Sequence, residues 1–149
     1  MTSRILKKSA LALVLCAVAA PAWGLDGSVP AIHGDVSRSL LGDGTGVVIG
    51  IIDSGVDELH PALAGADSLF NPRMVAKANF ASGSTTLHGH GTWVASAALS
   101  DDPVFTGMAP DAGFISARVL SSTNSFPNDT PVRHGVGFAI DQGADILNL

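Results

Sequence analysis

The sequence predicts a three-layer α/β/α fold built on a mainly parallel β-sheet. Three continuous apolar runs have the length and composition of strands that are buried on both faces. Segments with helical periodicity lie between them, and this alternation favours parallel strands joined by right-handed crossovers. The 17 glycines and 8 prolines among 149 residues indicate many tight turns between short elements.

The N-terminal residues have the pattern of a secretory signal peptide. Basic residues at positions 4, 7 and 8 precede the apolar run 10–20, and small residues follow it. This run is shorter than the roughly 20 residues that span a bilayer. We therefore expect a signal peptide at 1–22, no permanent membrane anchor, and a secreted or periplasmic protein.

Without this segment the chain is acidic and has no cysteine. Cys16 leaves with the signal peptide, which excludes an internal disulfide and a cysteine-bound metal. The remainder keeps 5 of the 8 Lys and Arg residues against 13 acidic residues, a formal charge of −8. A hydrophobic fraction of 46% excludes a disordered chain. Because the chain is acidic and has no basic cluster, we expect no nucleic-acid partner.

The expected elements follow one another in a regular order. Residues 23–44 show little periodicity and are expected to be a loose leading segment with a short helical turn at 36–41. Pro131 suits a first helical turn and Gly143 suits a helix end. We expect strands at 46–53, 74–80, 113–120 and 144–149, and helices at 91–99 and 130–142.

The sequence stops inside the last expected strand, at Leu149, with no turn or polar tail after it. A strand that ends there leaves an open sheet edge. We therefore expect a fold that is incomplete at its C-terminus, either as a piece of a longer protein or as the product of a truncated gene.

Two segments carry residues suited to catalysis. Asp53 ends the first buried strand, and the carboxyl ends of parallel strands open into the ligand crevice. His90 lies between two glycines at the start of an expected helix. Histidine can take a proton from a hydroxyl nucleophile, and a buried carboxylate can fix its tautomer. Alone, each residue fits a cap or an exposed loop better; both motifs together, in this order, favour catalysis.

Segments 51–57 and 88–95 resemble the Asp and His signatures of the subtilisin-like serine proteases, the peptidase S8 family. Residues 107–110 and 135–149 resemble later blocks of that family, so the resemblance covers about 45–149. It implies a subtilisin-like fold and a secreted serine endopeptidase that acts on polypeptide substrates through an Asp-His-Ser triad. By the same resemblance, Asp53 and His90 are the catalytic Asp and His and His88 lies near the substrate groove.

The sequence departs from the family pattern in three places. Trp93 replaces the second histidine of the His signature, at a structural position that an apolar side chain can fill. Ala62 stands where many members have an Asp that binds a structural calcium. No cofactor is certain, and calcium in a longer parent protein stays open. The Ser block has no counterpart before Leu149. We therefore expect 45–149 to be a partial catalytic domain that is inactive alone.

Two other functions stay open. The chain fits a non-catalytic half of a protease that binds peptides or pairs with a separate C-terminal half. It also fits a zinc hydrolase in which His88 and His90 bind the metal with Asp53 or Asp57. Against zinc, no further Asp or Glu-His partner follows the histidine pair.

Overall fold

The computed structural model describes residues 25–64, 71–83, 85, 87–125 and 128–149. The expected signal peptide at 1–22, with Cys16, lies outside the described residues. In the part of the chain that is described, no helix has the length and apolar character needed to cross a membrane.

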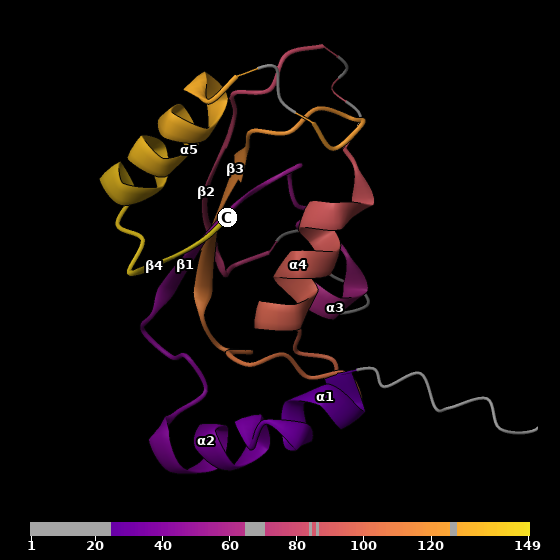
Figure 1. The fold of residues 1–149 in the computed structure, drawn as a ribbon. Coiled ribbons are helices and arrows are strands. Elements are labelled where there is room, and N and C mark those ends of the chain that lie inside the picture. Colours follow the sequence, from indigo (N-terminus) through magenta and orange to yellow (C-terminus); the bar gives the residue numbers. More distant parts are fainter. Residues whose placement is uncertain (1–24, 65–70, 84, 86, 126–127) are drawn as a thin grey trace, which may run out of the picture.

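The described residues form a three-layer α/β/α structure, which confirms the predicted fold class. The strands are β1 (Val48–Asp53), β2 (Met74–Asn79), β3 (Gly113–Arg118) and β4 (Ile146–Asn148). The helices are α1 (Leu25–Ala31), α2 (Gly34–Leu41), α3 (Pro61–Ala64), α4 (Gly89–Leu99) and α5 (Thr130–Asp141). The strands form one parallel sheet in the order β2-β3-β1-β4. Helix α5 covers one face, α3 and α4 lie on the other, and α1 and α2 lie at one end (Figure 1).

Strand β1 lies inside the sheet, which explains its unbroken apolar sequence. It pairs with β3 from Val48–Gly113 to Asp53–Arg118, so both strands end at the same edge. Five of the six residues of each strand are buried. Their side chains alternate between two core clusters, one toward α4 (with Ile51, Leu63, Leu99 and Phe114) and one toward α5 (with Ile52, Ile115, Ala117 and Ala139). This register places Asp53 at the carboxyl edge of the sheet, as expected.

Each expected strand and helix is present, with ends that differ by a few residues. Helix α4 begins at Gly89 rather than at position 91 because His88 caps it. Helix α5 has proline in its first turn, and Gly143 follows it with φ 86°. The ends of helices and strands are hard to predict because they depend on caps and partners that a single segment does not reveal.

The leading segment differs from the expectation. Residues 25–31 form α1, where no helix was expected, and the expected turn at 36–41 lies within the longer helix α2 at 34–41. Tertiary contacts explain this difference: Val29 is buried, and Gly34 packs against the side chains of Val29 and Met108. Arg38 on α2 also donates hydrogen bonds to the carbonyl oxygens of Thr106 and Gly107. Periodicity within the segment gives little sign of these distant partners.

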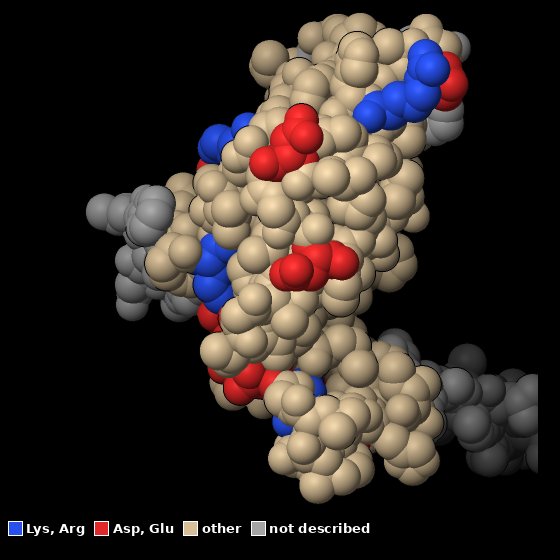
Figure 2. Space-filling view, turned by 90° about the vertical axis from the view of Figure 1, so that its left-hand side faces the viewer, with Lys and Arg blue, Asp and Glu red and all other residues tan. Residues whose placement is uncertain are grey.

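Charged side chains do not gather into a large patch on the face drawn in Figure 2. Acidic and basic residues lie there in small separate groups among uncharged surface. This distribution fits the low charged fraction of 14% in the sequence.

The packed face between the sheet and α4 gives the first prediction. Phe114 on β3 is fully buried, so the substitution Phe114→Ala removes a ring from a space that cannot collapse fully. We expect the free energy of unfolding to fall by about 3–5 kcal/mol in urea titrations of the full-length protein. As a control, Val75→Ala on β2, where the side chain is 52% exposed, should change it by less than about 0.5 kcal/mol. Similar losses in both variants would contradict the assignment of this core.

Candidate active site

The structure brings Asp53 and His90 into direct contact. The Nδ1 atom of His90 lies 2.9 Å from Oδ1 and 3.0 Å from Oδ2 of Asp53. Asp53 is buried, whereas the His90 side chain is 37% exposed. The carboxylate therefore faces the inner edge of the imidazole, and the outer edge stays accessible.

Asp53 is held by the end of β1 and by the chain that follows β3. Its carbonyl oxygen accepts hydrogen bonds from the backbone N–H groups of Val119 and Leu120, at 2.7 and 3.2 Å. Its Oδ1 accepts a hydrogen bond from the backbone N–H of Ser54 at 2.6 Å. A buried carboxylate is costly unless such donors and a positive or polar partner compensate for lost water. Here the backbone donor and the imidazole supply that compensation.

His90 is held by the first turn of α4. His88 is the N-cap of this helix, with extended φ and ψ of −91° and 138°, and its Nδ1 accepts a hydrogen bond from the His90 backbone N–H at 3.2 Å. The cap satisfies one of the free N–H groups at the helix start. His88 therefore has a clear structural role, and its expected contact with substrate stays a prediction.

Ser54 is a positioning residue whose role the sequence did not predict. Its buried hydroxyl donates a hydrogen bond to the carbonyl oxygen of His88 and accepts one from the Gly91 N–H, both at 2.9 Å. These two bonds join the residue after Asp53 to the residues on either side of His90. A small polar residue directly after the strand-ending Asp was the only sequence signal of this role.

Gly91 is required by the close approach of α4 to the loop after β1. A Cβ atom at this position would lie 2.3 Å from the carbonyl oxygen of Gly55, closer than real Cβ contacts. Next to it, the Thr92 hydroxyl accepts a hydrogen bond from the Asp57 N–H at 2.9 Å. The glycine thus allows the helix start to reach the strand end that carries Asp53.

Trp93 lies one helical turn after His90 and contacts it edge-on. The ring centroids are 6.1 Å apart with an interplanar angle of 72°. Trp93 is 71% exposed, so in the described residues it covers the side of the imidazole instead of filling a core position. An open hollow of about 500 Å³ lies beside it, lined by Asp57, His60, Leu87, Gly89, Thr92, Trp93 and Ser96.

Two other ionisable residues near the site, Glu58 and His60, interact with groups other than Asp53 and His90. Burial raises the pKa of Glu58, but the hydrogen bond and charge of Lys77 more than offset this effect, and the net pKa lies below its usual value. Glu58 is therefore a counter-ion of Lys77. The His60 Nδ1 atom accepts a hydrogen bond from the Ala62 N–H at 3.2 Å, so this histidine stabilises the turn into α3.

Within the described ranges, no three His, Cys, Asp or Glu side chains converge on a point where a metal ion could bind. His88 points its Nδ1 at the backbone of His90, while His90 points its Nδ1 at Asp53. The described residues thus offer no ligand set for the zinc alternative.

The contact between Asp53 and His90 allows the imidazole to act as a general base. When the Nδ1–H of His90 donates to Asp53, Nε2 carries a lone pair at the exposed edge of the ring and can accept a proton. The carboxylate then stabilises the imidazolium that forms. Because the tautomer follows from the hydrogen bond, Asp53 orients the ring so that Nε2 faces outward as the proton acceptor.

The sequence is similar to proteins of one known family. Residues 44–149 match the sequence profile of the subtilase family, peptidase S8. Over 115 residues, 73% of this chain and 38% of the relative, the chain is 33% identical to thermitase of Thermoactinomyces vulgaris. It is 32% identical over 126 residues to subtilisin DY of Bacillus licheniformis, covering 81% of this chain and 42% of the relative. The chain thus spans less than half the length of these relatives.

The junction between β1 and α4 gives the second prediction. Gly91→Ala places a methyl group against the Gly55 carbonyl, and backbone cannot move away cheaply. We expect a loss of about 1–3 kcal/mol in the free energy of unfolding and a shift of the His90 imidazole NMR resonances as its contact with Asp53 weakens.

Gly89→Ala is the matched control, since its Cβ meets nothing within 4 Å in the same helical turn. Alanine has the higher helix propensity, so this variant should be unchanged or more stable by up to about 1 kcal/mol. Equal behaviour of the two variants would show that the close approach does not position His90.

Proposed function

This chain belongs to the subtilase family of serine proteases, and on that premise we propose that it contributes the Asp and His of a catalytic triad. The whole protein is then a serine endopeptidase that hydrolyses polypeptides. The observation that carries the proposal is the contact between His90 Nδ1 and the buried Asp53 carboxylate at 2.9 Å.

The proposed reaction begins with a serine hydroxyl that attacks the carbonyl carbon of a peptide bond. Nε2 of His90 takes the hydroxyl proton as the bond from Oγ to carbon forms, and the imidazolium then gives that proton to the leaving amine. Water repeats the cycle on the acyl-enzyme, with His90 again acting as base and then as acid. Asp53 stays ionised and stabilises the positive ring at each stage.

None of the three serines described near the site is placed to act as the nucleophile, because each hydroxyl bonds to the backbone. The hydroxyl of Ser54 is used in the junction, Ser96 donates to the Trp93 carbonyl, and Ser116 accepts from the Val56 N–H. In the described part of the chain no hydrogen bond joins a serine hydroxyl to the His90 ring. We therefore assign the nucleophile and its oxyanion-binding groups to another part of the protein.

We also propose that the protein is exported from the cytoplasm. The basic residues, the short apolar run and the small residues before position 24 support export through a signal peptide at 1–22. N-terminal sequencing of the protein from culture medium tests the cleavage site, which we expect after Ala22.

The third prediction concerns the two catalytic side chains. In the full-length protein, Asp53→Asn and His90→Ala should each lower kcat for a peptide substrate by about 10⁴-fold or more, a magnitude carried over from known serine proteases. His33→Asn is the control, because His33 is exposed, lies far from the site in sequence, and has the positive φ of 60° that asparagine tolerates. Retained activity in the His90 variant would refute the proposal.

The fourth prediction concerns the 149-residue polypeptide by itself. Purified free of other proteases, it should show no casein hydrolysis above buffer, because it supplies a base and its partner without a nucleophile in reach. Casein hydrolysis by the purified polypeptide would contradict the assignment of the nucleophile to another part of the protein.

A further inference from the structure

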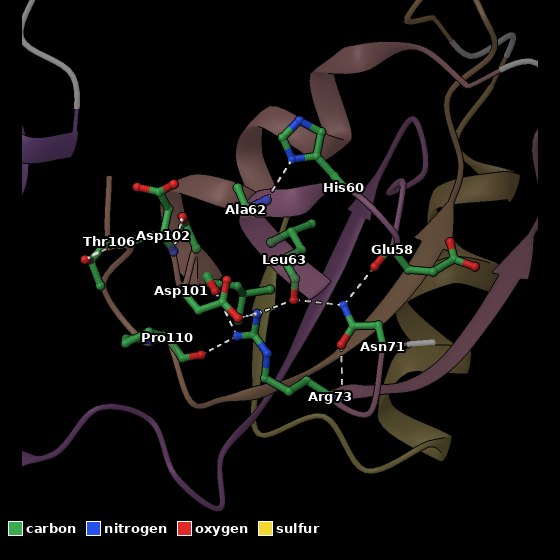
Figure 3. Close-up of polar contacts among 12 residues, drawn as sticks. Glu58, His60, Ala62, Leu63, Asn71, Arg73, Asp101, Asp102, Thr106 and Pro110 are labelled. Carbon is green, nitrogen blue, oxygen red and sulfur yellow. Dashed lines mark hydrogen bonds and ion pairs between the residues drawn. The ribbon is translucent and has the colours of Figure 1, made fainter. Parts of the chain in front are cut away.

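The side chain of Arg73 holds together four separate segments of the chain (Figure 3). Arg73 lies directly before β2. Its guanidinium donates hydrogen bonds to the carbonyl oxygens of Leu99, at 2.8 Å, and of Leu63 and Pro110. It also faces the carboxylate of Asp101 at 3.4 Å. We call these five residues the Arg73 cluster.

Two of the carbonyl oxygens in the Arg73 cluster lie at the ends of helices, where no backbone N–H of the same helix can reach them. Leu63 lies in the last turn of α3, and Leu99 is the last residue of α4. The final carbonyl groups of a helix have no intrahelical donor and carry the negative end of the helix dipole. A guanidinium offers five N–H donors and a positive charge. The side chain of Arg73 is only 16% exposed, so water replaces few of these bonds.

Asn71 completes the arrangement around Arg73. It is buried, donates hydrogen bonds to the carbonyl oxygens of Glu58 and Leu63 at 2.9 and 3.0 Å, and accepts one from the Arg73 N–H at 3.0 Å. The Leu63 oxygen thus accepts from both side chains. Both of its lone pairs are used.

The loop after α4 is organised by protein groups as well. Asp102 accepts hydrogen bonds from the N–H groups of Phe105 and Val104, both at 2.8 Å, and these bonds lower the pKa of its carboxyl. Arg38 donates to the carbonyl oxygens of Thr106 and Gly107. Arg38 and Arg73 therefore both donate hydrogen bonds to backbone carbonyl oxygens within residues 99–110.

The family resemblance implies a structural calcium bound by an Asp at the position of Ala62 in many members, and the residues described here do not fit that ion. Calcium takes six to eight oxygen ligands and usually several carboxylates. Ala62 supplies no carboxylate, and its carbonyl oxygen accepts a hydrogen bond from the Asp101 N–H at 3.1 Å. The carbonyls of Leu63 and Leu99 already bind Arg73. A calcium ion beside the guanidinium would also meet a like charge.

We propose that the guanidinium of Arg73 takes the structural place of a calcium ion in this chain, so that the region around residues 99–110 needs no calcium to hold its conformation. The proposal depends on the donors and acceptors of the Arg73 cluster and is independent of the proposed protease activity.

Hydrogen-deuterium exchange of the full-length protein tests this locally. In wild type, amide exchange across 99–110 should be the same in excess EDTA and in millimolar calcium chloride. Arg73→Met should speed that exchange by roughly 10-fold or more in both buffers and lower the melting temperature by roughly 10 °C. Arg133→Met is the matched control: Arg133 is 71% exposed and its ion pair with Asp129 lies on the surface, so both readouts should stay at wild-type values.

Arg73→Lys keeps the proposal testable if the methionine variant does not fold. Lysine keeps the charge but not the planar fork, so we expect partial loss of protection across 99–110 that calcium does not restore. Calcium-dependent protection of 99–110 in wild type would overturn the proposal. Wild-type exchange in the lysine variant, or equal effects of Arg73→Met and Arg133→Met, would also overturn it.

Discussion

The packing of the first turn of α4 against the end of β1 is the contact on which the candidate site depends. At Gly91 the two backbones approach so closely that a Cβ atom would lie 2.3 Å from the facing carbonyl oxygen. The Ser54 hydroxyl donates a hydrogen bond to the His88 carbonyl oxygen and accepts one from the Gly91 N–H. Because Ser54 directly follows Asp53, the same bonds that join strand to helix fix the distance between Asp53 and His90.

Helix α4 carries complementary charges at its two ends. The carboxylate of Asp53 lies beside its first turn, where the helix dipole is positive, and the guanidinium of Arg73 binds the carbonyl of its last residue, Leu99, where the dipole is negative. Ala95 and Leu99 are fully buried against the sheet between these ends. Fixed at both termini and along one face, the helix has little freedom to move His90 away from its partner.

The sequence alone predicted the parts of the structure that depend on local pattern. The buried run of β1, the Asp at its end and the Gly-flanked histidine each have a local signature, and the register of the sheet brings them together as expected. Helix α1, the full length of α2, and the roles of Ser54 and Arg73 were missed because they depend on partners elsewhere in the chain. The carbonyl acceptors of Arg73 lie 10 to 37 positions away along the chain. Because every residue has a backbone carbonyl, the sequence does not show which of them will accept.

Replacing a bound ion by a side chain changes what stability depends on. A bound ion stabilises the folded state only in proportion to its concentration relative to its dissociation constant. A guanidinium attached to the chain is always present and stays charged across the physiological pH range, at the cost of ordering one long side chain. In the Arg73 cluster much of that cost is offset by bonds to carbonyl groups that otherwise lack donors. On this proposal, the conformation around the end of α4 does not depend on the calcium concentration of the surroundings.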